Sequence, residues 1–105
     1  MEIVFKSLEL ENIFRTGKET GKPKYGQHII KAFVKVVVIL KRAPNTTLLS
    51  KMRSLHFEAL KHELRGYHSV RVNDQYRLIF KIEKKGLKVK ITVETIEIYS
   101  LEDYH

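Results

Sequence analysis

The stretch of sequence that decides the fold is residues 67–80, YHSVRVNDQYRLIF. In its first part, Tyr67–Val72, the even-numbered residues His, Val and Val share one face of an extended strand. Asn73-Asp74 is typical of a tight turn. In the following Tyr76–Glu83, the even-numbered Tyr, Leu, Phe and Ile again share a face. The stretch therefore predicts two antiparallel strands that turn one apolar face toward a core.

The chain on either side extends this sheet. Phe57–Lys61 predicts a short strand before a turn at residues 63–66, and Lys84-Lys85-Gly86 predicts a second hairpin turn. Lys88–Tyr99 predicts the last strand. Its apolar residues change from odd to even numbers, which favours a β-bulge near Glu94-Thr95.

The N-terminal part predicts a short strand over Glu2–Lys6 and then helices. Ser7 is a capping residue in front of a helix over Leu8–Thr16, and Gly17 ends that helix. The loop of residues 17–23 follows, by its Gly and Pro content.

The second helical segment is Tyr25–Arg42. Its many β-branched residues favour a strand, but the helical spacing of its apolar residues and its length predict a helix, which Pro44 ends. Thr46 or Thr47 is predicted to cap a further short helical turn. A short strand, two helices and then an antiparallel meander packed on them predict an α+β fold. At 105 residues, we expect one domain spanning residues 1–105.

Composition excludes several classes of protein. The chain has no Cys, which rules out disulfide scaffolds, thiolate zinc sites and cysteine nucleophiles. Its longest apolar run, Val36–Leu40, is far shorter than the roughly 18 residues of a membrane span. The first residues, MEIVFK, lack the basic region and cleavage site of a signal peptide. We expect a soluble, cytoplasmic protein without a membrane partner.

The charge distribution gives the first indication of function. The net charge is +8, and no acidic residue occurs between Thr20 and Phe57. That segment contains eight basic residues: Lys22, Lys24, Lys31, Lys35, Lys41, Arg42, Lys51 and Arg53. A field of this kind attracts the phosphates of nucleic acid, although an acidic protein partner or a plain solvated surface would also fit.

The residues that could do chemistry handle phosphate rather than metal. His56, Glu58 and His62 lack the helical spacing of zinc hydrolases, no glycine-rich phosphate loop occurs, and no serine has a nucleophile-elbow context. What is left is a set of basic and proton-transferring residues: Lys61, Arg65, Arg71, Arg77, Tyr104 and His105. Arginine binds phosphate bidentately, and histidine transfers protons near neutral pH, so the set suits RNA cleavage by the 2′-OH. Spacing alone also fits plain surface residues.

Residues 60–80, LKHELRGYHSVRVNDQYRLIF, together with the closing Asp103-Tyr104-His105, resemble the HigB group of the RelE superfamily. These are toxins of bacterial type II toxin–antitoxin systems. The resemblance implies a small α+β endoribonuclease that cleaves mRNA in the ribosomal A site. It also implies no metal or cofactor, and three partners: the ribosome, mRNA and a HigA-like antitoxin.

The resemblance assigns roles by position. Lys61 and Arg77 match the basic pair that binds and stabilises the phosphate, and Asp103, Tyr104 and His105 match the catalytic tail. His105 would act as general acid or base, Tyr104 as a stacking or proton-relay group, and Asp103 as an orienting group. Arg65 and Arg71 are weaker RNA-binding candidates, since Arg71 can equally face solvent. We expect Tyr67 and Tyr76 to pack in the core.

Two departures from the family pattern leave questions open. His62 stands where the pattern has Gly, and Glu58 stands where some members have His. Which of His56, Glu58 and His62 takes part in proton transfer is therefore undecided. Two other readings also remain: a gyrase inhibitor of the ParE type, which has the same fold, and a non-catalytic module that binds RNA or the ribosome.

Overall fold

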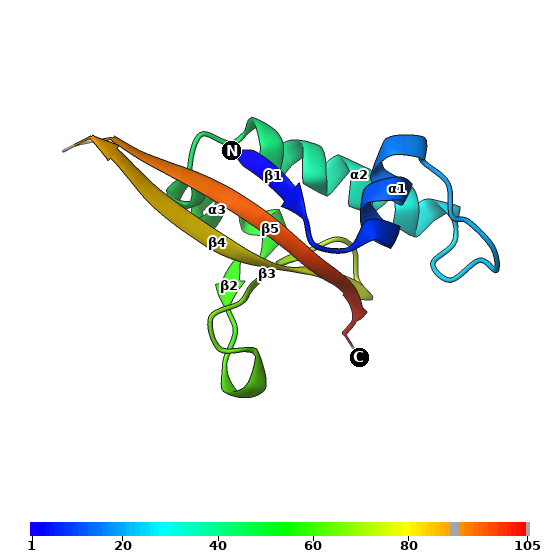
Figure 1. Ribbon diagram of the computed structural model, residues 1–105. Helices are drawn as coiled ribbons and strands as arrows, with labels where there is room; N and C mark the ends of the chain where they lie inside the picture. Colours follow the sequence, from blue (N-terminus) through cyan, green and yellow to red (C-terminus); the bar gives the residue numbers. More distant parts are fainter. Residues whose placement is uncertain (89–90, 105) are drawn as a thin grey trace.

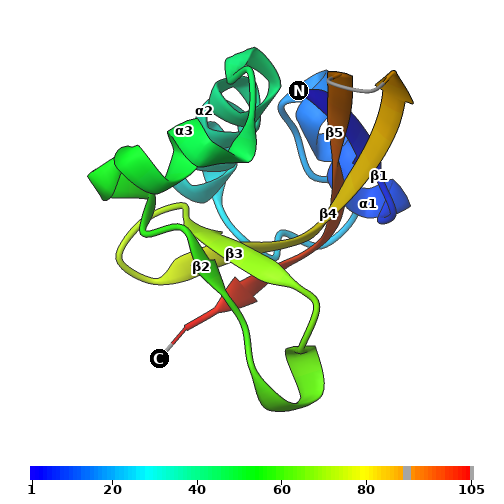
Figure 2. The same cartoon turned by 90° about the vertical axis from the view of Figure 1, so that its left-hand side faces the viewer.

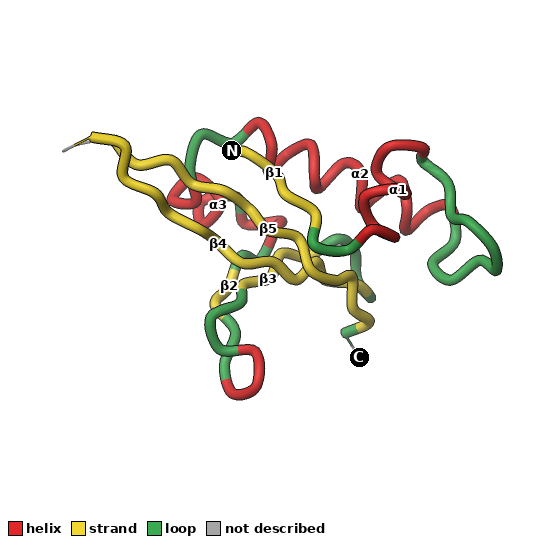
Figure 3. The backbone as a smooth tube through the Cα atoms, in the orientation of Figure 1, coloured by secondary structure: helices red, strands yellow, loops and turns green. Residues whose placement is uncertain are grey.

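The computed structural model describes residues 1–88 and 91–104. Its helices and strands succeed one another as a strand, three α-helices and four more strands, with two short 3₁₀ turns between (Figures 1 and 3). In chain order the elements are β1 Glu2–Phe5, α1 Leu8–Thr16, α2 Gln27–Arg42, α3 Thr46–Lys51, η1 Arg53–Leu55, β2 Glu58–Ala59, η2 His62–Leu64, β3 His68–Arg71, β4 Tyr76–Lys88 and β5 Ile91–Asp103.

The strands form one sheet in the order β1-β5-β4-β3-β2. From β2 to β5 the strands are antiparallel, as the sequence predicts, while β1 joins the edge of the sheet parallel to β5. The helices lie on one side of the sheet, and the segment with β2 and η2 projects from the other side (Figures 1 and 2). The predicted α+β fold is confirmed.

The core lies between α2 and the sheet. Apolar residues at helical spacing on α2 meet the even-numbered residues of the hairpin, and the most completely buried of them are Phe33, Val37, Leu40, Val70, Leu78, Phe80, Ile96 and Ile98. This packing explains why a segment rich in β-branched residues is helical, since tertiary burial outweighs local propensity.

Local capping fixes the helix ends. The Ser7 hydroxyl accepts the N–H of Leu10 at 3.2 Å, and Gly17 ends α1 in the left-handed conformation, both as predicted. The second helix begins at Gln27, two residues later than predicted. The cause is Glu19, whose carboxylate accepts the backbone N–H groups of residues 24–26 and holds them in a loop.

The residue that caps α3 differs from the prediction. Asn45, rather than Thr46 or Thr47, accepts the N–H of Leu48, at 3.0 Å. Thr46 is engaged elsewhere: its N–H and its hydroxyl both donate to the carboxylate of Glu94 on β5. A contact with a residue 48 positions away decides which side chain caps the helix.

The β4–β5 hairpin differs from the prediction in two ways. Residues 84–86 are strand, paired with residues 92–94, so the predicted hairpin turn there is wrong. The bulge lies at Tyr99, between the pairs Phe80–Ile98 and Ile79–Ser100, whereas Glu94 and Thr95 pair in regular register. The distal part of the hairpin extends beyond the helices, giving the molecule a length of 48 Å (Figure 1). Val93 is therefore exposed there, and the change of apolar phase needs no bulge; Val89 lies outside the described residues.

Within residues 1–88 and 91–104, no helix has the length and apolar character that crossing a membrane would require.

Candidate active site

Arg77 is the centre of the candidate site. It lies on β4 among the odd-numbered residues, which face away from the core, yet its side chain is only 11% exposed. Its Nε donates to the Ser69 hydroxyl at 2.9 Å, and its Nη2 donates to the backbone carbonyl of His56 at 2.6 Å. The carboxylate of Glu58 lies 3.5 Å from the same Nη2. The guanidinium is thus held in one orientation by three different segments.

The strand pairing brings these partners together. Ser69 on β3 is fully buried and pairs with Glu58 on β2, while β3 pairs with β4 on its other side. His56 follows η1 in the left-handed conformation, with φ 45°, and this turn presents its carbonyl to Arg77. The position of the guanidinium therefore follows from the register of β2, β3 and β4.

Tyr104 covers the outer side of this arrangement. Its ring centroid lies 5.2 Å from the Arg77 Cζ atom, a cation–π contact, and its N–H donates to the carbonyl of Gln75 at 2.7 Å. The ring is half exposed and lines three shallow depressions. One of them, of about 310 Å³, also contains Lys61 and Glu58. Tyr104 therefore borders both the depression that Lys61 lines and the one that Arg77 lines.

The remaining predicted residues differ in how they relate to Arg77. Arg71 lines a depression with Arg77 and Tyr104, but its guanidinium is held by Asp74 and by the carbonyl of Asn73. Arg65 is exposed in the turn after η2. His105 lies outside the described residues.

Asp103 contacts the site through a neighbour. Its carboxylate accepts a hydrogen bond from the Gln75 side chain at 3.0 Å, and the carbonyl of the same Gln75 accepts the N–H of Tyr104. Asp103 therefore fixes the turn that holds the backbone of Tyr104.

The residues that the sequence left undecided also border the site. Glu58 contacts Arg77 directly, His56 lines the depression with Arg71, and His62 lines the one with Lys61. His62 has φ 60°, a left-handed backbone in the place where the family pattern has Gly. Sequence reasoning did not find Ser69, whose role depends on strand pairing that no local pattern reports.

His68, by contrast, belongs to the core side of β3. Its ring stacks with those of Phe57 and Phe80, at centroid distances of 5.4 and 6.2 Å, and the two phenylalanine rings are themselves 6.2 Å apart. Burial, together with the charge of Lys84, lowers the pKa of His68 below its ordinary value, so the ring is neutral near pH 7.

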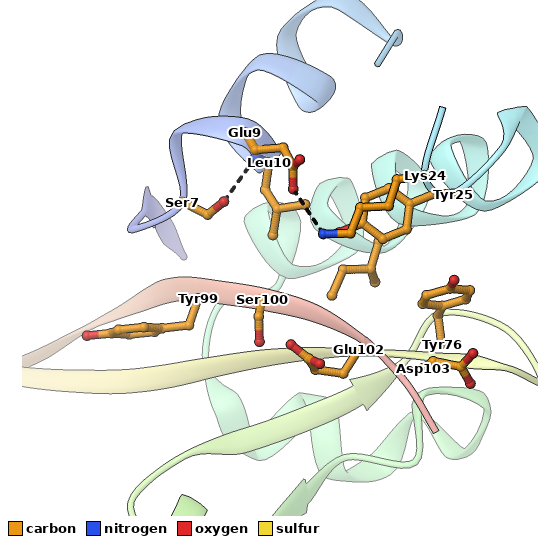
Figure 4. A pocket seen from close by; sticks show the side chains of 11 residues that line it. Ser7, Glu9, Leu10, Lys24, Tyr25, Tyr76, Tyr99, Ser100, Glu102 and Asp103 are labelled. Atoms are coloured by element: carbon orange, nitrogen blue, oxygen red, sulfur yellow. Dashed lines mark hydrogen bonds and ion pairs between the residues drawn. The ribbon is translucent and has the colours of Figure 1, made fainter. Parts of the chain in front are cut away.

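A separate cavity of about 390 Å³ lies between α1, the loop before α2 and β5 (Figure 4). Glu9, Glu102 and Asp103 line it together with Lys24, whose ammonium is 3.9 Å from Glu9 (Figure 4). Its excess of carboxylates disfavours phosphate, which makes the surface around Arg77 the better candidate for RNA.

Within the described part of the chain, no three His, Asp or Glu side chains are grouped so that they could hold a metal ion.

Comparison with known proteins identifies the family of the chain. Residues 4–94 match the family model described as HigB-like toxin, the RelE-like toxin of the type II toxin–antitoxin system HigB. The matched region contains Lys61, Arg65, Arg71 and Arg77, while residues 103–105 lie beyond it. No curated protein sequence matches the chain.

Among solved structures, the chain resembles a YoeB/ParE toxin from Agrobacterium tumefaciens. The TM-score is 0.57 at 17% sequence identity, and the alignment covers 100% of both chains. At this identity the likeness establishes the fold. Because the family model covers most of the chain, the protein belongs to the HigB-like family of RelE-like toxins of type II toxin–antitoxin systems, a family that implies an antitoxin partner.

Proposed function

We propose that this toxin is an endoribonuclease that cleaves mRNA in the ribosomal A site. The observation that carries the proposal is the fixed orientation of Arg77 next to the exposed ring of Tyr104, which also lines a depression with a second cation, Lys61. A guanidinium that is already held in place stabilises developing phosphate charge without reorganising during the reaction. The net charge of +8 supports a polyanionic partner.

The reaction that suits this set is attack by the ribose 2′-OH on the adjacent phosphate. The bond between O2′ and phosphorus forms and the bond from phosphorus to O5′ breaks, which leaves a 2′,3′-cyclic phosphate and a 5′-OH. A base takes the proton of the 2′-OH, and an acid supplies a proton to O5′. Side-chain cations can stabilise the pentavalent phosphorus, so the chemistry requires no metal.

We assign the roles as follows. Arg77 and Lys61 bind the phosphate, and Tyr104 stacks on a base beside it. Glu58, whose carboxylate lies 3.5 Å from the Arg77 guanidinium, is the candidate base. His105 is the candidate acid, and Asp103 acts as a positioning residue through Gln75. Arg65 and Arg71 would contact the RNA backbone more peripherally.

The test is primer extension on a reporter mRNA in a purified translation system, with Arg77→Ala beside the wild type. We expect cuts that need ribosomes, and a loss of about 100-fold or more in the variant, the order found when one charge-stabilising donor is removed. Arg15→Ala is the matched control. It removes the same group from α1, where Arg15 pairs with Glu11 at 3.2 Å, and it should leave cleavage unchanged.

Intact mRNA in the presence of wild-type protein that still arrests growth would contradict the proposal. Inhibition of DNA supercoiling by gyrase, measured with the same preparation, would then establish a toxin of the ParE type.

A further inference from the structure

A second cluster of aromatic rings and a cation lies near Arg77. The rings of Tyr67 and Tyr99 meet edge to face, with centroids 5.1 Å apart. The ammonium of Lys81 lies 4.6 Å from the centre of the Tyr67 ring and 5.5 Å from that of Tyr99. All three side chains are partly exposed. The role of this cluster in the protein is not explained by packing of the core.

The sheet places this cluster on the same face as the candidate active site. Lys81 lies four residues after Arg77 on β4, so both side chains point away from the core. The bulge at Tyr99 leaves two residues, Tyr99 and Ser100, opposite one position of β4, between the core-facing Ile98 and Leu101. Alternation from Ile98 places Tyr99 on the outer face, where its ring lies beside Lys81. Bulges commonly re-aim a side chain beside a functional site.

Tyr67 completes the cluster from the start of β3. Its carbonyl accepts the N–H of Leu60 at 2.9 Å, which fixes its backbone beside the segment that carries Lys61. The prediction that Tyr76 packs against the core is confirmed, but the same prediction for Tyr67 is wrong, because Tyr67 lies outside the core cluster. The alternation of β3 explains this, since odd-numbered residues of that strand face away from α2.

The chemistry of the cluster suits a nucleotide. Tyrosine rings stack on any base, and an ammonium beside them can hold the adjoining phosphate. Among the described residues, neither phenol oxygen has a hydrogen-bond partner, so both polar ends are available to a ligand. The acid that faces Lys81 across the sheet is Glu97, and its carboxylate is paired with Lys6 at 3.6 Å. Among the residues that the structure describes, no acid therefore forms a direct ion pair with Lys81.

The distance between the two clusters fits a continuous strand of RNA. Four residues of β-strand separate Arg77 from Lys81, a rise of about 13 Å. Between them lies a depression of about 430 Å³, lined by Leu64, Ile79, Ser100, Glu102, Asp103 and Tyr104. The described helices α1, α2 and α3 lie on the opposite side of the sheet, whereas the short η2 projects from this side (Figure 2). A short single-stranded segment can therefore cross from one cluster to the other.

We propose that Tyr67, Lys81 and Tyr99 form a second RNA subsite, which stacks the base and holds the phosphate of a nucleotide flanking the one that is cleaved. The proposal rests on the proposed nuclease function and adds to it a determinant of mRNA binding remote from the reacting phosphate.

The experiment combines a change in the protein with a change in the RNA. Ribosomes are programmed with synthetic mRNAs that lack one base at a time on either side of the cleaved bond. Cleavage is measured under single turnover with wild-type toxin and with the double variant Lys81→Ala/Tyr99→Leu. We expect the variant to raise the half-saturating toxin concentration at least about fivefold, the lower end of the effect of one stacked base. Its rate at saturation should stay close to that of the wild type.

The RNA change identifies the contacted nucleotide. At one flanking position, removal of the base should raise the half-saturating concentration of the wild type by a similar factor. It should not raise that of the variant any further. Equal penalties in wild type and variant at every position would overturn the proposal. The single variant Tyr99→Phe keeps the ring and should bind programmed ribosomes like the wild type. This result would separate a loss of stacking from a loss of protein stability.

The control is Lys18→Ala, at an exposed lysine in the loop after α1. It removes one ammonium outside the cluster and should leave the half-saturating concentration unchanged; an equal effect of Lys18→Ala would count against a specific subsite. Failure of the nuclease proposal itself is distinguishable, because the wild type would then cut none of the mRNAs.

Discussion

Arg77 contacts an acid as well as two neutral acceptors, and the acid has two possible consequences for function. Glu58 lies 3.5 Å from the guanidinium on a side chain that is half exposed. As a proton acceptor it would speed cleavage. As a counter-charge only, Glu58 would compete with the RNA phosphate for Arg77 and would slow cleavage. The two roles predict opposite effects of the same substitution.

We predict that Glu58→Gln lowers the single-turnover cleavage rate by about 100-fold or more, the range of general acid–base catalysis. The amide keeps the shape of the side chain but cannot take the proton of the 2′-OH. The measurement is cleavage of ribosome-bound mRNA at saturating toxin, with Glu63→Gln, an exposed acid of η2, as the control. A faster variant would assign Glu58 the opposing role and leave the base to His56 or His62.

At the scale of elements, Glu94 joins β5 to the start of α3. Its carboxylate accepts the N–H of Thr46 at 3.1 Å and the Thr46 hydroxyl at 2.5 Å, and Lys84 lies 3.8 Å away. Burial alone would raise the pKa of Glu94, but these hydrogen bonds and the charge of Lys84 bring it below its ordinary value. The ionised form therefore favours the folded state.

The sign of the pH dependence follows. A carboxyl whose pKa is lower in the folded state stabilises the protein above its unfolded value of 4.5, and this contribution is lost as the pH falls through the folded value. We predict that Glu94→Gln lowers the free energy of unfolding by about 1–2 kcal/mol at neutral pH. The difference from wild type should shrink in acid, in urea titrations between neutral pH and pH 3. The exposed Glu63→Gln should show neither effect, and a constant difference would contradict the linkage.

Local signals predicted those elements whose ends depend on neighbouring residues. The Ser7 cap, the Gly17 end of α1 and the alternation through β3 and the first half of β4 all lie within a few positions in the sequence. The bulge at Tyr99 and the parallel pairing of β1 with β5 depend on contacts across the fold, so the pattern of one strand could not locate them. The candidate site divides in the same way. Arg77 stood out by residue type, whereas the partners that orient it come from β2, β3 and the end of η1.

At the scale of the whole molecule, the charge is distributed unevenly. All eight basic residues between Thr20 and Phe57 are exposed, and no acid lies among them in the sequence. On α2, the exposed Lys31 and Lys35 follow one another at the spacing of about one helical turn. The helices lie on the opposite side of the sheet from β2 and η2 (Figure 2). A polyanion could therefore contact the helices while mRNA occupies the other face.

We predict that this helical surface contacts ribosomal RNA. The variant Lys31→Glu/Lys41→Glu lowers the net charge from +8 to +4, since each reversal removes two charges. The control Lys18→Glu/Lys85→Glu makes the same change in net charge at two exposed sites outside α2. Ribosome binding is measured over a series of salt concentrations. The α2 variant should bind more weakly, with a slope of log K against log salt that is smaller by about 1.4–1.8, because each of the two lost phosphate contacts removes roughly 0.7–0.9. The control should keep the wild-type slope. An unchanged slope in the α2 variant would mean that this surface does not face the ribosome, and the same pair of variants would then test whether the antitoxin binds there.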